Sequence, residues 1–151
     1  MVAIACRERC VIGRWRTFMS PISSSPRKAV VIDDDPLVCE FVHTVLSAVG
    51  FEVFAELTGE RGVERIRELA PALVVVDMRL PGIDGLEVIR TVGALPMPLP
   101  TIVGMSAAWA ETEKQAIALG AVAFLRKPLR ADIVVGTVEK ALGGRFVWIE
   151  A

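Results

Sequence analysis

The sequence predicts an α/β fold with an open, doubly wound sheet of parallel strands, and two patterns support this. The first is a set of five short apolar runs with little polar alternation, at residues 29–33, 51–55, 72–77, 101–106 and 121–125. Runs of this kind are typical of strands buried on both faces. The second pattern is a helical stretch after each run, which gives five strand–helix units. Right-handed crossovers then place the helices on both faces of one sheet.

Each helical stretch has apolar residues at helical spacing. The five stretches are residues 36–49, residues 58–69, a segment marked by Leu86, Ile89 and Val92, a segment ending near Leu119, and residues 131–142. Thr58 is a suitable N-cap for the second helix. Gly50 and Gly143 follow the first and the last helix, and glycine is common at such ends.

The composition indicates a single domain without a membrane segment. The chain has 151 residues, about the size of one domain. Apolar residues make up 53% of it, but no apolar run reaches the roughly 18–20 residues that a membrane helix needs. The cysteines Cys6, Cys10 and Cys39 lack metal-ligand spacing, and the charged N-terminus is a poor secretory signal. We therefore expect a reducing, cytoplasmic location.

The N-terminal residues differ in charge from the rest of the chain. Residues 1–28 hold six basic residues and one acidic residue, and the remainder is acidic overall. Their last part, residues 20–28, is rich in Ser and Pro and is typical of a linker. A basic arm can contact nucleic acid or anionic lipid, but we favour a disordered leader, or a true start at Met19. The chain then divides into this leader, a domain at 29–142 and a short apolar tail at 143–151.

Polar side chains stand where four of the five predicted strands end. Asp33 and Asp34 end the first run, Asp77 the third and Ser106 the fourth, and Lys127 follows the fifth. The second run delivers no such residue, which fits an edge strand in the flavodoxin-like strand order 2-1-3-4-5. Because the carboxyl ends of parallel strands share one edge of the sheet, we expect these side chains to lie together.

This combination of side chains suits phosphoryl transfer to a carboxylate. Clustered carboxylates repel one another unless a cation lies among them, and oxygen-only ligands favour a hard ion such as Mg²⁺. A carboxylate beside that ion can act as a nucleophile toward a phosphoryl group. The ammonium group and the hydroxyl can then stabilise the charge on the phosphoryl oxygens.

Four segments of the chain resemble the receiver domains of response regulators. The segment VVIDDDPLV resembles the opening of that family, and VVVDMRLPGIDGLEVI resembles its phosphorylation segment. TIVGMSA and FLRKPL resemble the segments that carry its switch hydroxyl and its lysine. The segments occur in the family's order and at similar spacing, and the likeness extends from about Ala29 to Leu142. The resemblance implies a two-component signalling protein with Mg²⁺ as its cofactor.

The resemblance assigns roles to the acidic residues. Asp77 matches the phosphoacceptor, and Asp33 and Asp34 match the acidic pair that holds Mg²⁺, with Asp34 as the more direct ligand. Asp77 itself and the backbone carbonyl of Arg79 match further metal ligands. Asp35 lies just beyond the pair and is expected to open the helix that follows.

The resemblance also assigns a switch. Ser106 matches the hydroxyl that meets a phosphoryl oxygen, and Lys127 matches the lysine that pairs with the phosphate. Phe124 matches the aromatic switch position. In the family the Lys-Pro bond after the fifth strand is often cis, which for Lys127-Pro128 costs only about 0.5–1 kcal/mol relative to trans.

The predicted function is that of a stand-alone receiver, similar to a chemotaxis regulator. Only 28 residues precede the first predicted strand and nine follow the last helix, so we expect no DNA-binding domain. The domain would take its phosphoryl group from a sensor histidine kinase or a histidine phosphotransfer protein. It would then bind a downstream target protein, or form a homodimer through the fourth helix, fifth strand and fifth helix.

Two other functions remain open. The domain could serve as a phosphate shuttle or sink in a phosphorelay, and the sequence does not separate this from the first hypothesis. It could also be a degenerate receiver that binds a partner without phosphorylation, but the intact set of Asp77, Ser106 and Lys127 argues against this. We expect no enzymatic activity on other molecules beyond catalysis of its own aspartyl phosphorylation and dephosphorylation.

Overall fold

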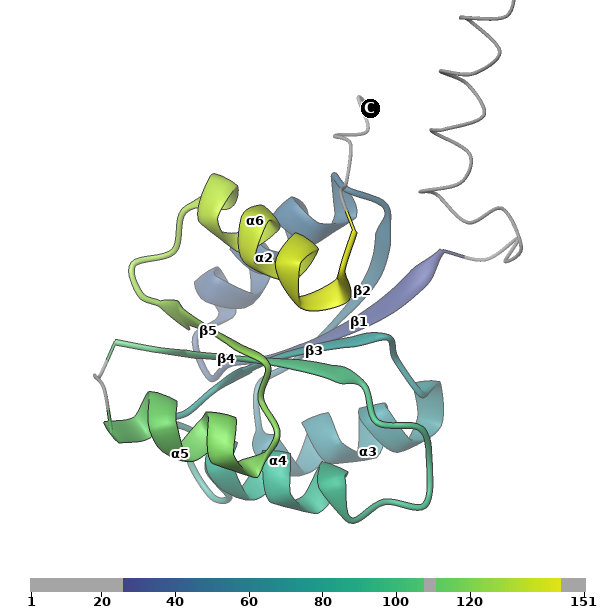
Figure 1. The fold of residues 1–151 in the computed structure, drawn as a ribbon, viewed down its shortest axis with the longest axis vertical. Helices are drawn as coiled ribbons and strands as arrows, with labels where there is room; N and C mark the ends of the chain where they lie inside the picture. The colour runs from purple at the N-terminus through teal and green to yellow at the C-terminus, as the bar shows by residue number, and fades with distance from the viewer. Residues whose placement is uncertain (1–25, 108–110, 145–151) are drawn as a thin grey trace, which may run out of the picture.

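Five parallel strands form one twisted sheet in the order β2-β1-β3-β4-β5 (Figure 1). In this computed structural model the described residues are 26–107 and 111–144. The strands are β1 (Arg27–Ile32), β2 (Phe51–Glu56), β3 (Leu73–Asp77), β4 (Thr101–Ser106) and β5 (Ala123–Arg126). The predicted order, with the second strand at an edge, is confirmed.

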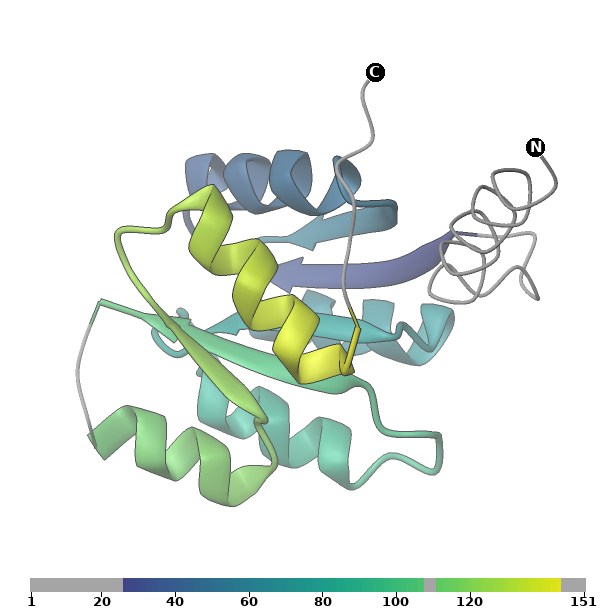
Figure 2. The same cartoon turned by 45° about the horizontal axis from the view of Figure 1, so that its top comes forward.

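Helices cover both faces of the sheet, as predicted for a doubly wound fold. Within the described ranges these are α2 (Pro36–Ser47), α3 (Gly59–Leu69), α4 (Gly85–Gly93), α5 (Glu111–Leu119) and α6 (Ala131–Leu142). Helices α2 and α6 lie on one face, and α3, α4 and α5 lie on the other (Figures 1 and 2). None of these described helices is long and apolar enough to cross a membrane.

The sheet separates two apolar cores, which explains the uniform hydrophobicity of the central strands. In β1, Ala29 and Val31 pack with α2 and α6, whereas Val30 and Ile32 pack with α3 and α4. All of β3 is buried. A strand covered by helices on both faces has no solvent-facing side, so polar alternation is absent.

Local side chains set the helix starts. Asp35 caps α2 by accepting a hydrogen bond from the Leu37 N–H at 2.9 Å, as expected for the residue that opens this helix. Thr58 caps α3 as predicted, and Asp84 caps α4. At the other end, Gly143 ends α6 in the left-handed region with φ 67°.

The first strand begins earlier than the apolar pattern predicts. Strand β1 starts at Arg27, and Arg27 and Lys28 pair with Phe51 and Glu52. The first strand therefore begins two residues before the apolar run, because these charged side chains are at least partly exposed and add nothing to the apolar pattern. Most of the predicted leader, 1–25, and most of the predicted tail, 145–151, lie outside the described residues.

Strand β5 also differs from its prediction by two residues. It spans Ala123–Arg126, whereas the apolar run covers 121–125. Ala121 is buried, but its N–H donates to the carbonyl of Ala116 at 3.0 Å. It therefore belongs to the turn after α5, where burial gives it the same apolar character as a strand residue.

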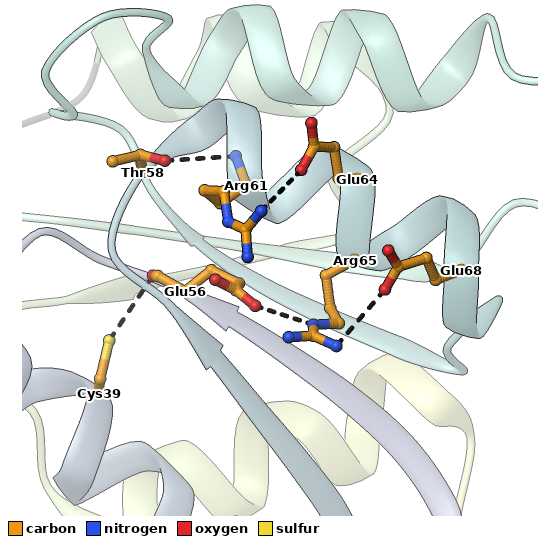
Figure 3. A network of polar contacts seen from close by, with 7 residues as sticks. All are labelled: Cys39, Glu56, Thr58, Arg61, Glu64, Arg65 and Glu68. Carbon is orange, nitrogen blue, oxygen red and sulfur yellow. Dashed lines mark hydrogen bonds and ion pairs between the residues drawn. The ribbon is translucent and has the colours of Figure 1, made fainter.

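An ionic network attaches the edge strand β2 to α3 (Figure 3). Arg65 Nε lies 2.8 Å from Glu56 Oε1, and its guanidinium also contacts Glu68 at 3.4 Å. The same guanidinium lies 5.8 Å from the centre of the Phe54 ring. Glu56 is the last residue of β2, so this network holds the strand end beside the site described next.

Candidate functional site

Polar residues from four strands meet at the carboxyl edge of the sheet. Asp77 and Ser106 are the last residues of β3 and β4, and Asp33 and Lys127 directly follow β1 and β5. Asp33, Asp77 and Ser106 are the buried polar residues of the described part of the chain, with exposed fractions of 0%, 5% and 1%. Burying polar groups is costly unless they are paired, so their concentration at one edge marks a functional site.

Three carboxylates form a compact oxygen cluster. Asp33, Asp34 and Asp77 each offer an oxygen atom, and these atoms lie within 4.8 Å of one another. Asp33 and Asp77 are buried, whereas Asp34 is exposed at the rim. Oxygen donors at this spacing are the ligand type that Mg²⁺ prefers, so the residues fit the ion that the sequence predicts.

Lys127 lies among the buried carboxylates. Its Nζ is 2.6 Å from Asp33 Oδ2 and 3.4 Å from Asp77 Oδ2. Its side chain is only 20% exposed. The closer contact is therefore with Asp33, whereas the sequence assigned Lys127 to the phosphate on Asp77.

The pKa values of Asp77 and Lys127 are both raised, for different physical reasons. Burial and the nearby charge of Asp33 raise the pKa of Asp77, while Lys127 and the backbone N–H of Arg79 act in the opposite direction. Burial alone would lower the pKa of Lys127, but its hydrogen bond to Asp33 and the charge of Asp77 raise it overall. Lys127 therefore stays protonated.

Asp33 is held by backbone contacts that the sequence did not reveal. Its Oδ1 accepts the Asp35 N–H at 2.9 Å, and its own N–H donates to the carbonyl of Glu56 at 3.2 Å. The Cys39 thiol donates to the Asp33 carbonyl at 3.3 Å, and burial raises the pKa of this thiol to about 11. Strand β2, expected to contribute nothing, thus supports the site through the backbone of Glu56.

The loop after β3 approaches the phosphoacceptor candidate through its backbone. The backbone N–H of Arg79 acts on the Asp77 carboxylate in the direction that lowers its pKa. A Cβ atom on Gly85 would lie 2.3 Å from the Asp77 carbonyl, so only glycine allows the loop to return this closely. The metal-ligand role of the Arg79 carbonyl stays a prediction.

The aromatic switch candidate lies on the edge strand β5, which β4 separates from β3 and its Asp77. Phe124 in β5 is partly buried and packs against the core beneath α3, α4 and α5. Its ring faces Gly104 in β4, two residues before Ser106. The Lys127-Pro128 peptide bond that follows β5 is cis, as the resemblance implied. Sequence reasoning identified Phe124 but not its contact with Gly104.

A doubly wound parallel sheet with carboxylates, a hydroxyl and a lysine at its strand ends defines a class of α/β proteins that bind ligands at this edge. Residues 29–139 match the model of the response regulator receiver domain. The chain therefore belongs to the response regulator receiver domain family of two-component signalling systems.

Two curated transcriptional regulatory proteins are similar to this chain in sequence. The transcriptional regulatory protein ZraR of Escherichia coli K12 is 32% identical over 113 residues, which cover 75% of this chain and 26% of the relative. The transcriptional regulatory protein FixJ of Bradyrhizobium diazoefficiens is 30% identical over 112 residues, covering 74% of this chain and 55% of the relative. The chain thus spans between a quarter and about half the length of these curated relatives.

A solved receiver structure agrees with the fold. The signal receiver domain of NarL from Mycobacterium tuberculosis is 31% identical to this chain and superposes with a TM-score of 0.72. The match covers 80% of this chain and 99% of that domain. The strand order, the layers and the family are therefore consistent with one another.

Proposed function

We propose that this domain accepts a phosphoryl group on the Asp77 carboxylate in the presence of Mg²⁺. The observation that carries the proposal is a buried Asp77 with Lys127 Nζ 3.4 Å away and two further carboxylates within 4.8 Å. The donor would be a phosphohistidine of a sensor histidine kinase or a histidine phosphotransfer protein. Because such donors derive from ATP, we place the domain in the cytoplasm.

The proposed transfer is a displacement at phosphorus. A carboxylate oxygen of Asp77 attacks, the P–O bond forms as the P–N bond to histidine breaks, and the released imidazole nitrogen takes a proton from water. Hydrolysis of the acyl phosphate later returns the carboxylate and inorganic phosphate. The domain catalyses both steps on itself and needs no other substrate.

The residues of the site have separate roles in this reaction. Asp33, Asp34 and the Arg79 carbonyl, together with Asp77, would hold Mg²⁺, which supplies positive charge next to the phosphoryl oxygens when bound. Lys127 adds a second positive charge and is already held at the site by its 2.6 Å contact with Asp33. This pairing keeps the ammonium group in place before the phosphoryl group arrives.

Signalling would follow from Ser106 and Phe124. A phosphoryl oxygen on Asp77 offers the Ser106 hydroxyl a charge-assisted hydrogen bond, which is stronger than a neutral one. Forming it would draw the end of β4 toward the site and change the packing of Phe124 on Gly104. The affected surface is formed by α5, β5 and α6, where Ile117 of α5, Ile133 of α6 and Val122 just before β5 are exposed hydrophobic residues.

This surface would bind a downstream protein or a second copy of the chain. ZraR and FixJ are described as transcriptional regulatory proteins, but the matches cover only part of each. We therefore do not propose that this chain regulates transcription. Output by a stand-alone domain stays a prediction, and so does the alternative of a phosphate shuttle or sink. Binding partners captured with the phosphorylated and unphosphorylated forms distinguish a target protein from a phosphotransfer protein.

The direct test uses acetyl phosphate as a small-molecule donor, with intact mass as the readout. We expect one Mg²⁺-dependent phosphoryl group on the wild-type protein and none on Asp77→Asn. Asp132→Asn is the matched control, because Asp132 is exposed on α6 and pairs only with Arg130 in the described contacts. Equal labelling of Asp77→Asn, or labelling without a divalent cation, contradicts the proposal.

A further inference from the structure

The loop that joins β3 to α4 rests on the first turn of α3. Glu60, the second residue of α3, accepts a hydrogen bond from the backbone N–H of Ile83 through Oε1 at 3.1 Å. The two residues are 23 positions apart in the chain. Glu60 is exposed, so this hydrogen bond links two segments at the surface and is not part of the apolar core.

Two glycines allow this close approach. Gly82 has φ +75°, and a Cβ atom there would lie 2.4 Å from Glu60 Oε1. A Cβ atom on Gly59 would lie 2.6 Å from Ile83 Cγ1 and 2.7 Å from the Ile83 carbonyl. A larger residue at position 59 would push the loop away from α3, whereas one at position 82 would displace the Glu60 carboxylate from the loop. Both glycines therefore allow the contact between Glu60 and the Ile83 N–H.

The two ends of the same loop lie close to Asp77 in the chain and in space. The Arg79 backbone N–H acts to lower the pKa of the Asp77 carboxylate, and the Gly85 N–H donates to the carbonyl of Met78, the residue after Asp77, at 3.2 Å. The middle of the loop is held by the hydrogen bond from the Ile83 N–H to Glu60. Among the hydrogen bonds of the described residues, this one joins the loop to α3. Hydrogen bonds from its own backbone and from Ile83 lower the pKa of Glu60, so the acceptor stays ionised.

We propose that Glu60 is a positioning residue, whose carboxylate holds the loop 79–83 so that the Arg79 backbone faces the Asp77 pocket. This inference rests on the proposed function, because it concerns the loop that is expected to supply the third metal ligand. A backbone carbonyl binds an ion more tightly when its segment is already fixed, because less conformational entropy is lost on binding. Groups that orient metal ligands typically influence metal affinity without touching the ion.

Two other roles for Glu60 make different predictions. Its negative charge could attract Mg²⁺ at a distance, or it could simply stabilise the N-terminus of α3 through the helix dipole. Glu60→Gln removes the charge but keeps a side-chain oxygen that accepts the Ile83 N–H. Glu60→Ala removes both. Positioning therefore predicts that Gln behaves like the wild type, whereas both charge-based roles predict that Gln behaves like Ala.

The experiment measures the loop and the metal separately. In the metal-free protein, hydrogen exchange of the Ile83 amide should become about tenfold faster in Glu60→Ala and stay near wild type in Glu60→Gln. Calorimetric titration with Mg²⁺ should show affinity about fivefold to tenfold weaker for Glu60→Ala and within twofold of wild type for Glu60→Gln. Glu64→Ala, which removes an exposed glutamate of the same helix, is the matched control.

The outcomes distinguish this inference from the proposed function. Unchanged Mg²⁺ affinity in Glu60→Ala overturns the positioning role, even if the Ile83 amide exchanges faster. Equal losses in Glu60→Gln and Glu60→Ala also overturn it and assign the effect to charge. Asp34→Asn tests the metal site itself: if that variant binds Mg²⁺ like the wild type, the proposed function fails, whatever Glu60 does.

Discussion

The ring of Phe124 occupies the space that a side chain on Gly104 of the neighbouring strand would need. The two residues are register partners in β5 and β4, and a Cβ atom on Gly104 would lie 2.8 and 2.9 Å from ring carbons Cδ2 and Cε2. The same atom would lie 3.3 Å from Cε of Met78, which directly follows Asp77. The absence of a side chain at position 104 therefore determines where the ring of Phe124 lies.

Gly104→Ala should displace the Phe124 ring and destabilise the domain. Overpacking of this kind costs about 1–3 kcal/mol, measurable as a lower urea midpoint. The double variant Gly104→Ala/Phe124→Ala removes the ring carbons that the added methyl group meets, so the cost of Gly104→Ala should largely disappear in that background. An undiminished cost in the double variant contradicts the contact.

A second glycine provides the control for the substitution itself. Gly136 lies within α6, and a Cβ atom there would have no neighbour within 4 Å. Gly136→Ala should therefore stabilise the domain by about 0.5–1 kcal/mol, since alanine restricts the unfolded chain and favours helix. The opposite signs of the two glycine variants would separate steric contact from backbone preference.

The sequence was sufficient to predict which side chains gather at the site. Asp77 and Ser106 end strands and Asp33 directly follows one, the apolar runs of these strands are visible in the sequence, and parallel strands bring their carboxyl ends together. The contacts that hold these residues were not predictable in this way. The Asp33 N–H bonds the Glu56 carbonyl, and Glu60 bonds the Ile83 N–H, so both contacts involve backbone groups that every residue carries.

Asp77→Asn should raise the melting temperature by several degrees at neutral pH without Mg²⁺. Burial and the charge of Asp33 raise the pKa of Asp77, so the ionised form is less favourable in the folded protein than in the unfolded chain. For a raised carboxyl pKa, stability falls as the pH rises from the unfolded pKa through the folded pKa. Asparagine carries no charge and avoids this loss.

The pH dependence provides the check on this explanation. The difference in melting temperature between Asp77→Asn and the wild type should be small near pH 3 and should grow to a plateau at neutral pH. Saturating Mg²⁺ should reduce the difference, because binding stabilises the wild type. A gain that is equally large at acidic pH would assign it to packing and not to charge.

The start of β1 predicts where the chain can be shortened. The Lys28 carbonyl accepts the Ala72 N–H at 2.9 Å, and Arg27 pairs with Phe51. A protein starting at Ala29 should melt a few degrees below one starting at Pro26, and both should label at Asp77, since every site residue lies later in the chain. Lys28→Ala in the longer form keeps the backbone contacts and should melt like its parent. Equal melting of the two shortened forms would contradict the role of these contacts.

Ser106→Ala should separate phosphorylation from the switch. Ser106 is buried, and its backbone carbonyl accepts the Lys127 N–H at 3.0 Å, a contact that alanine keeps. With the carboxylates and Lys127 in place, Asp77 should still be labelled by acetyl phosphate. The variant lacks the hydroxyl that would bond a phosphoryl oxygen, so β4 has no charge-assisted contact to draw it inward.

The readout is the set of NMR shifts that phosphorylation causes in α5 and around Phe124. These shifts should occur in the wild type, be absent in Ser106→Ala and return in Ser106→Thr, which restores a hydroxyl at the same position. Phe124 has no hydroxyl to desolvate, so we also expect a minor population of the switched conformer in the unphosphorylated protein. Relaxation dispersion at Phe124 would measure it. Shifts that persist in Ser106→Ala would place the switch in other residues, because only the hydroxyl distinguishes that variant from the wild type.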